Sequence, residues 1–296
     1  MPESPSIHQS VLLDEIVEWL NPLPGQVVVD GTLGGAGHTR ALVDRVGMSG
    51  RVVALDRDPA ALARAEQMLA GKPVMLADSN FCELPEVLRQ IGIQQVHGVV
   101  LDLGLSSDQL ADRERGFSFE SDGPLDLRFN PDEGEPASRL VNRLSEQSLA
   151  DLIFQYGEER HSRRIARAIG AARRERPVQT SAELAAIVRR AVPRTPDSRR
   201  IDPATRTFQA LRIAINEEIK SLETALLRIP DLLAPGGRLA IISFHSLEDR
   251  PVKQAFRDDP RLNVLTRKPI LPGDLELARN PRSRSAKLRV AERRAD

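Results

Sequence analysis

A glycine-rich turn directly after a β-branched run is the part of this chain best suited to hold a small ligand. The run Val27–Val29 ends at Asp30, and glycine occupies positions 31, 34, 35 and 37 of the turn that follows. Glycines let backbone amides approach a ligand closely, and open α/β sheets bind nucleotide-like ligands beyond the carboxyl ends of their strands. The turn therefore predicts a site for a nucleotide-like molecule; a purely structural turn is the alternative.

The spacing of these residues narrows the choice of ligand. It does not give the dinucleotide fingerprint G-x-G-x-x-G. Asp30-x-Thr32-x-Gly34 instead resembles the first motif of S-adenosylmethionine (SAM) methyltransferases, with Thr32 in place of the usual first glycine. Asp56 ends the next apolar run, where a carboxylate can accept hydrogen bonds from ribose hydroxyls. NAD and SAM both carry a ribose, but no proton donor for hydride chemistry is evident at the right strand ends, which disfavours a dehydrogenase.

Four short apolar runs predict the strands that position these residues. They are Val27–Asp30, Arg51–Asp56, Val74–Asp78 and Gly98–Asp102, and each ends on an aspartate. Helical patterns lie between them at Thr39–Val46, Pro59–Leu69 and Glu83–Ile91. This alternation is typical of an α/β protein with a doubly wound, Rossmann-like parallel sheet. All four aspartates then lie at one edge of the sheet, unless they only cap the helices that follow.

Two of these strand ends suggest further roles at the same edge. Asp78-Ser79-Asn80-Phe81 offers polar groups and an aromatic ring to an adenine. Asp102 is expected to face the reaction centre, because it ends the fourth strand.

The alternation stops after Asp102, and no strand is expected before Arg238. Gly116–Ala137 is rich in Gly, Pro, Asp and Phe and predicts an ordered loop or linker. Three helices are expected next, at Ser145–Tyr156, Glu159–Glu175 and Thr180–Ala191, followed by a return linker at Pro193–Pro203. We therefore expect a mainly helical substrate-recognition domain over residues 105–204, inserted into a cofactor-binding domain formed by residues 1–104 and 205–296.

The C-terminal part is expected to complete the sheet. Apolar residues from Phe208 to Leu226 recur at three- and four-residue steps, which predicts one long helix packing on the sheet. Ala234–Gly237 predicts a turn into a strand at Arg238–Phe244. The runs Leu262–Arg267 and Lys287–Ala291 are expected to form a closing antiparallel pair.

Composition excludes several classes of protein. The chain has 296 residues, 41% of them hydrophobic, and 42 basic residues balance 42 acidic ones. Charge is nevertheless segregated: acids dominate from Asp102 to Glu159, and arginines from Arg160 to Arg212 and Arg250 to Arg294. Segregation permits an RNA-binding surface on a neutral protein, although solvated helix faces give similar runs.

The single cysteine, Cys82, excludes an internal disulfide framework and a multi-cysteine metal site, so no metal is expected. Without a signal or membrane-spanning run, we expect a soluble cytoplasmic protein.

Several longer blocks carry a specific resemblance. They are Asp102-Leu-Gly-Leu-Ser-Ser-Asp-Gln-Leu110, Arg115-Gly-Phe-Ser-Phe119, Asp122-Gly-Pro-Leu-Asp-Leu-Arg128, Tyr156-Gly-Glu-Glu-Arg160, Ala204-Thr-Arg-Thr-Phe-Gln-Ala210, Ile242-Ser-Phe-His-Ser-Leu-Glu-Asp-Arg250 and Asn280-Pro-Arg-Ser-Arg-Ser-Ala-Lys-Leu-Arg289. From about His8 to Arg293 the chain resembles the bacterial ribosomal small-subunit RNA (cytosine-N4)-methyltransferase H family, of MraW type. The stretch between Val252 and Asn280 is shorter than in many relatives.

The resemblance implies a class I SAM-dependent methyltransferase fold and methylation of the exocyclic amine of one cytidine in the decoding region of 16S ribosomal RNA. The substrate is expected within the small ribosomal subunit, with no DNA or membrane partner; the oligomeric state stays open. The implied cofactor contacts are Ala36, Gly37, His38, Asp56, Phe81, Asp102 and Gln109, to which the turn adds Gly34. A methyltransferase with another acceptor, or an assembly factor without activity, is the alternative.

Three residues are expected to carry the chemistry. Asp102 and Ser106 offer hydrogen-bond acceptors to the attacking amine, although Asp102-Leu-Gly-Leu is not the motif that amino-methyltransferases of bases commonly carry at this strand end. His245 follows the last parallel strand and either reaches the target base or is structural. Asp126 and Arg128 either bind RNA or hold their loop in place.

Basic residues for phosphate contact are expected in two groups. The inserted helices contribute Arg163, Arg164, Arg167, Arg173 and Arg174, and the C-terminal segment contributes Arg282, Arg284, Lys287 and Arg289. Trp19 and Tyr156 are expected to pack in the core.

Overall fold

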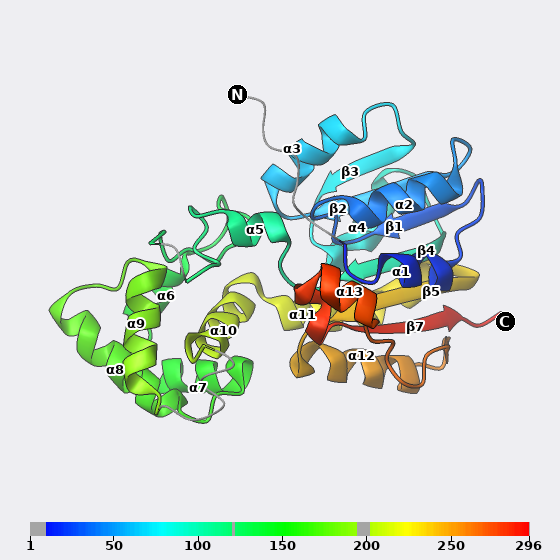
Figure 1. The fold of residues 1–296 in the computed structure, drawn as a ribbon. Helices are drawn as coiled ribbons and strands as arrows, with labels where there is room; N and C mark the ends of the chain where they lie inside the picture. The colour runs from blue at the N-terminus through cyan, green and yellow to red at the C-terminus, as the bar shows by residue number, and fades with distance from the viewer. Residues whose placement is uncertain (1–9, 120–121, 194–201, 296) are drawn as a thin grey trace. The chain divides into compact units, whose positions relative to one another are not determined.

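The computed structural model describes residues 10–119, 122–193 and 202–295. The chain divides into two compact units, Met1–Asp108 with Ile219–Asp296, and Gln109–Glu218 (Figure 1). The second unit thus starts and ends later than the expected domain of residues 105–204. The expected return linker lies almost entirely outside the described residues.

The first unit is built on one seven-stranded sheet with the order β3-β2-β1-β4-β5-β7-β6 (Figure 1). The strands are β1 Val27–Asp30, β2 Arg51–Asp56, β3 Val74–Asp78, β4 Val96–Asp102, β5 Leu233–Ser243, β6 Leu262–Val264 and β7 Lys287–Arg293. Strands β1 to β5 pair in parallel, whereas β7 runs antiparallel to both β5 and β6. The predicted parallel sheet and its closing antiparallel pair are confirmed.

Helices cover both faces of this sheet because alternate strand residues point to opposite sides. Val28 packs with α1 and α2, whereas Val29 packs with α4, α11 and α12. The helices of this unit are α1 Leu13–Leu20, α2 Gly37–Val46, α3 Pro59–Met68, α4 Leu84–Gln90, α11 Glu218–Arg228, α12 Ser246–Asp258 and α13 Asp274–Arg279, with the 3-10 turns η1 Phe81–Glu83, η3 Ile229–Leu232 and η4 Pro281–Ser285. Helix α5, Ser107–Ala111, spans the boundary between the units. Sequence patterns missed α1, α12 and α13.

The second unit is helical. Its helices are α6 Ala137–Arg143, α7 Glu146–Gly157, α8 Ser162–Glu175, α9 Ser181–Ala191 and α10 Ala204–Asn216, and α7 packs against both α8 and α10. Thr180 and Glu183 form a capping box at the start of α9, where the sequence predicted a helix at Thr180–Ala191.

The prediction of one long helix from Phe208 to Leu226 is wrong. Glu217 adopts a left-handed conformation with φ 52°, which ends α10 before α11 begins. Helix α10 packs within the second unit, while Leu222 and Leu226 of α11 join the core beneath the sheet. Spacing alone did not reveal the break, because the apolar stripe continues through it.

The predicted turn at Ala234–Gly237 lies inside strand β5. Leu233 pairs with Val96, and Arg238 pairs with Gly98, so the residues between them form an irregularity in the ladder. Gly236 adopts φ +77° there, a conformation that favours glycine. Pro235, Gly236 and Gly237 thus correctly indicate a turn, but this turn lies within the strand rather than before it.

The expected loop at Gly116–Ala137 is held by its own side chains. Arg128 makes a two-pronged ion pair with Asp126, at 2.8 and 2.7 Å, and Arg115 donates to the carbonyl of Arg128 at 2.9 Å. Buried Asn216 accepts from the N–H of Phe129 at 2.8 Å and donates to the carbonyl of Leu127 at 2.7 Å. Asp126 and Arg128 therefore hold the loop in place.

Candidate active site

One turn brings the ends of the neighbouring strands together. The turn after β1 donates from the N–H of Gly34 to Asp56 Oδ2, at 2.8 Å. Thr32 Oγ1 accepts from the N–H of Asp102, at 2.7 Å. A Cβ placed on Gly31 would lie 3.1 Å from Cβ of Phe81. Residues 56, 81 and 102 therefore surround one site at the carboxyl edge of the sheet.

Thr32 explains the departure from the usual glycine in this motif. Its N–H donates to Asp30 Oδ1 at 3.1 Å, and the other oxygen of that buried carboxylate accepts from Thr39 Oγ1 at 2.7 Å. Asp30 thus ties the turn to helix α2, and the Thr32 hydroxyl ties it to the main chain of Asp102. A glycine at position 32 has no side chain to make that second connection.

The start of α2 forms another wall. A Cβ on Gly37 would lie 1.9 Å from Ser10 Oγ, so only glycine lets residues 10–12 pass this closely. His38 Nε2 lies 3.0 Å from the carbonyl of Val11, and the N–H of Leu12 donates to Glu276 Oε1 at 2.8 Å. The segment before α1 therefore lies against the predicted cofactor contacts Ala36, Gly37 and His38.

Asp56 has the surroundings of a carboxylate that binds a ligand. Its Oδ2 accepts from Gly34, and its Oδ1 accepts from the N–H of Asp58 at 2.9 Å. Burial raises the pKa of Asp56 to about 6, while these two backbone bonds oppose the rise. A carboxylate has room for about four hydrogen bonds, so both oxygens can still accept from ribose hydroxyls.

Asp102 is surrounded by negative charge. Burial, followed by the carboxylates of Asp30, Glu248 and Glu276, raises its pKa well above the usual range. Within the described residues its Oδ1 has no hydrogen-bond partner, and its Oδ2 lies 3.8 Å from Nδ1 of His38. Burial also lowers the pKa of His38, which keeps this imidazole neutral.

The remaining predicted site residues differ in how far the geometry involves them. Ser106 is buried, and its Cβ would lie 3.6 Å from a Cβ on Gly34, so it borders the turn. Phe81 is the first residue of the 3-10 turn η1. Asn80 and Glu83 form a capping box at the start of this turn. Gln109 is buried and is the first residue of the second unit, so its role as a cofactor contact stays a prediction.

His245 lies at the carboxyl end of β5 and caps helix α12. Its Nε2 lies 3.1 Å from Glu248 Oε1, and Glu248 Oε2 accepts from the N–H of Phe244 at 2.8 Å. The ring lies against Glu248, and within the described residues neither ring nitrogen has a hydrogen-bond partner. The catalytic role of His245 stays a prediction.

Sequence reasoning missed two acids of the site. Glu248 follows His245 by one helical turn, and this capping pattern was a local signal. Glu276 had no such signal: it lies in the short helix α13 and reaches the site through the fold. Within the described residues no group of histidine, cysteine or acidic side chains is arranged to hold a metal ion.

These residues suit a positively charged nucleoside ligand such as SAM. The glycines let neighbouring segments of the chain pack closely around the turn, since a Cβ on Gly31 would lie 2.4 Å from Leu101 Cδ2 and one on Gly37 would lie 1.9 Å from Ser10 Oγ. Asp56 has hydrogen-bond acceptors for a ribose. The unpartnered Oδ1 of Asp102, near three further carboxylates, suits a cation. Phe81 offers a ring where the fold of nucleotide-binding proteins places the base.

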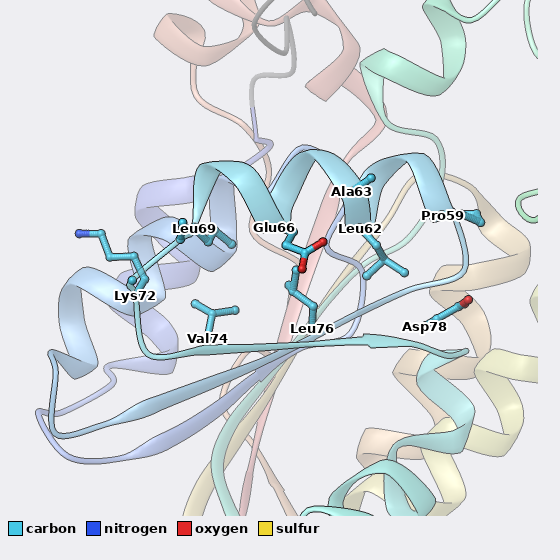
Figure 2. Close-up of a pocket in the computed structure, with 11 residues that line it drawn as sticks. Pro59, Leu62, Ala63, Glu66, Leu69, Lys72, Val74, Leu76 and Asp78 are labelled. Carbon is cyan, nitrogen blue, oxygen red and sulfur yellow. The ribbon is translucent and has the colours of Figure 1, made fainter.

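A separate groove of about 640 Å³ runs between α3 and β3 (Figure 2). Apolar side chains of Leu62, Val74 and Leu76 face it, with Glu66 and Lys72 also lining it. Asp78 at one end is its single lining residue from the four strand-terminal aspartates. The groove is thus distinct from the site around the glycine turn.

Comparisons with known proteins identify the family of this chain. The family model described as the MraW methylase family matches residues 5–294. Proteins named ribosomal RNA small subunit methyltransferase H from Rhodopirellula baltica and Deinococcus radiodurans are 51% and 52% identical to this chain; each match covers 97% of this chain, and 91% and 90% of the relatives. A putative rRNA-methylase from Clostridium thermocellum aligns over 95% of this chain and 94% of its own, with 15% identity and a TM-score of 0.47. The chain belongs to the MraW methylase family and has the α/β fold of class I SAM-dependent methyltransferases.

Proposed function

We propose that this methyltransferase transfers a methyl group from SAM to the exocyclic N4 amine of a cytidine in the decoding region of 16S ribosomal RNA, within the small ribosomal subunit. The observation that carries the proposal is the single turn that contacts Asp56, Phe81 and Asp102 at once. Membership of the family and the names of the relatives support the RNA acceptor.

Each residue of the site contacts a different part of the cofactor. Asp56 accepts hydrogen bonds from the ribose, and Phe81 packs against the adenine. Gly34 and residues 36–38 lie along the methionine end, at the turn between β1 and α2. When bound, SAM supplies an electrophilic methyl group on a positively charged sulfur.

The chain contributes mainly by positioning the amine. The lone pair of cytosine N4 is delocalised into the ring, so acceptors at its two hydrogens help the nitrogen to pyramidalise as it attacks. Asp102 and Ser106 provide such acceptors on one side of the glycine turn. Holding both reactants in line supplies roughly 7–11 kcal/mol at the favourable limit.

Helix α8 provides a face suited to an RNA backbone. Arginines at positions 163, 164, 167 and 174 of this helix are exposed, whereas Ile165 and Ile169 pack inward; the exposed Arg160 precedes the helix. Glu146 pairs with Arg174 at 3.6 Å, but within the described residues Arg163, Arg164 and Arg167 form no ion pair. Exposed arginines without ion pairs provide the positive charge that binding to RNA phosphates requires, so this face supports the proposal of a phosphate-bearing partner.

The other expected phosphate contacts separate into two kinds. Arg282 and Arg284 are exposed. Arg173 donates to the carbonyl of Val141 at 2.6 Å, while Arg289 and Lys287 both pair with Asp249. These last three basic residues therefore serve the protein's own structure, and are removed from the set proposed to contact RNA.

Methylation of purified small subunits from a strain lacking this enzyme tests the proposal. Labelled SAM and the purified protein should place the label in N4-methylcytidine after digestion of the RNA to nucleosides. Naked 16S RNA serves as the parallel substrate. Label in a ribose, in another base or in a ribosomal protein would overturn the proposed acceptor.

A further inference from the structure

We propose that Asp102 and His38 form one proton-holding pair, which carries a proton in the cofactor-free protein, releases it when a sulfonium cation binds, and then accepts the proton that leaves the amine during methyl transfer. The last of these steps rests on the proposed function. The release on cofactor binding does not depend on the identity of the acceptor.

The surroundings of Asp102 favour a proton on its carboxyl group. The side chain is 12% exposed, and Oδ1 has no hydrogen-bond partner among the described residues. The charged groups that act on it come from three other elements: Asp30 from β1, Glu248 from α12 and Glu276 from α13. All are acidic, and a carboxylate desolvated among other carboxylates retains its proton to higher pH.

His38 gives this proton a hydrogen-bond acceptor. The carbonyl of Val11, 3.0 Å from Nε2, can only accept, so Nε2 carries the hydrogen of the neutral ring. Nδ1 therefore presents its lone pair toward Oδ2 of Asp102, 3.8 Å away. Contacts of this kind are often long before the substrates bind and shorten in the reacting complex. A protonated Asp102 can then donate to Nδ1.

A bound sulfonium changes the balance. A positive charge beside a carboxyl group stabilises its ionised form, so the pair loses its proton to solvent as the cation binds. During methyl transfer the N4–methyl bond forms, and the carbon–sulfur bond breaks with its electrons staying on sulfur. The N4–hydrogen bond then breaks with its electrons staying on nitrogen, and the proton forms an O–H bond on Asp102. The product thioether is neutral, so the pair can keep this proton.

Calorimetric titration in buffers of different ionisation enthalpy tests the proposal without turnover. The cofactor-free protein is titrated with SAM and, in parallel, with the neutral product S-adenosylhomocysteine (SAH) across neutral pH. We expect SAM to release a measurable fraction of a proton, and SAH to release much less. In the pH range where binding releases a full proton, the Kd for SAM should fall about tenfold for each unit by which the pH is raised. Equal proton release for the two ligands would overturn the proposal.

Variants of the acids locate the proton. Asp102→Asn should abolish the difference between SAM and SAH, because an amide cannot ionise. Glu276→Gln should reduce release at a given pH by removing one of the surrounding charges. Asp274→Asn, an exposed change in the same helix, is the matched control and should leave release unchanged. An unaltered difference in Asp102→Asn would assign the proton elsewhere.

Two substitutions separate the positioning role of His38 from a merely structural one. His38→Asn keeps an acceptor near the place of Nδ1, whereas His38→Gln keeps a donor that can reach the Val11 carbonyl. We expect the Asn variant to retain most of the proton release and the pH profile of kcat. The Gln variant should lose part of both while its KM changes little. The opposite ranking would show that only the bond to Val11 matters.

The outcomes distinguish this proposal from the proposed function. Absence of SAM binding would refute the cofactor assignment itself. SAM binding without differential proton release would refute the pair and leave the methyltransferase assignment intact. Differential release together with methylation at another acceptor would refute only the cytosine-N4 assignment.

Discussion

Two loops of this protein contain glycine, aspartate and positive-φ residues, yet they use their polar groups in opposite ways. In the second unit, Arg115, Arg128 and Asn216 direct their donors to carbonyls or carboxylates of the loop around Leu127. In the first unit, the turn after β1 is itself hydrogen-bonded, but beside it the end of β4 leaves Oδ1 of Asp102 without a partner among the described residues and close to other acids. The loop of the second unit is structural, whereas the unpartnered oxygen of Asp102 supports the proposal of a ligand site.

The largest difference between the two loops is expected on replacing Asp102. Asp102→Ala should lower kcat by roughly 10²–10³, the usual cost of one electrostatic contact to a reacting group. The melting temperature of this variant should not fall. A buried carboxyl whose pKa is raised in the folded protein opposes folding at neutral pH, and the substitution removes it. Turnover and thermal unfolding measured on the same preparation check both parts. Full activity would remove Asp102 from the mechanism.

The structural loop should respond in the opposite way. Asn216→Leu leaves the N–H of Phe129 and the carbonyl of Leu127 without partners, which should cost about 2–4 kcal/mol of unfolding free energy. Urea unfolding measures the loss. Gln155→Leu, an exposed change in the same unit, is the control and should stay within about 0.5 kcal/mol. A loss no larger than that of the control would contradict the structural role of the loop.

Thr32 belongs to the turn beside the candidate site, but its hydroxyl is hydrogen-bonded, as the side chains of the structural loop are. Thr32→Val removes the acceptor for the N–H of Asp102 and should cost about 1–3 kcal/mol. Thr32→Ser keeps the hydroxyl and should retain most of the stability and activity. Chemical denaturation and kcat, compared between the two variants, test this connection. A loss in the Ser variant as large as that in the Val variant would contradict a specific role of the hydroxyl.

The pH dependence of Asp56 gives a smaller effect. Its pKa, raised to about 6, lies above the usual value of an unfolded aspartate, so its contribution to stability is present at low pH and is lost as pH rises from about 4 to 6. Asp56→Asn should abolish that slope. The affinity for neutral SAH should instead rise several-fold over the same range, because an ionised carboxylate is roughly twice as strong an acceptor. A flat SAH affinity would separate Asp56 from the ribose.

The smallest effect is expected on the arginine face of α8. Replacing Arg164 and Arg167 by Gln should make the plot of log binding constant against log salt concentration less steep. The slope should fall by about 0.7 for each phosphate that is no longer neutralised, which is the value for single strands. Affinity for RNA measured at several salt concentrations gives this slope. Arg40→Gln, an exposed change in the first unit, should leave it unchanged. An unchanged slope in the α8 variant would place the RNA elsewhere.

The sequence predicted the sheet well because its strands are short apolar runs that each end at an aspartate. All four predicted N-terminal strands coincide with β1–β4 to within two residues at their ends. The break at Glu217 was not predictable from spacing, since it depends on one left-handed residue within a continuous apolar stripe. The starts of α7 and α9 lie where the sequence predicted them, because the hydroxyls of Ser145 and Thr180 accept hydrogen bonds from N–H groups of the first helical turn.

The arrangement of the candidate site was predictable where its residues follow strands directly, as for Asp56, Phe81 and Asp102; their contacts with a cofactor stay predictions. It was not predictable where distant segments enter. Glu276 and the segment around Val11 reach the site only through packing of α13 and α1, and neither carries a local pattern. The arginines show the same limit, since Arg173 and Arg167 look equivalent in the sequence, but of these two Arg173 is the one that donates to a carbonyl of its own unit within the described residues.

The position of the insertion also sets the order in which the chain can fold during synthesis. Strands β1 to β4 are made first, but their neighbour β5 begins only at Leu233, and β7 only at Lys287. Helices α6 to α10 emerge between them with all their own packing partners. A ribosome making this protein therefore releases a finished helical unit while the sheet still has an open edge at β4, and the catalytic unit closes last.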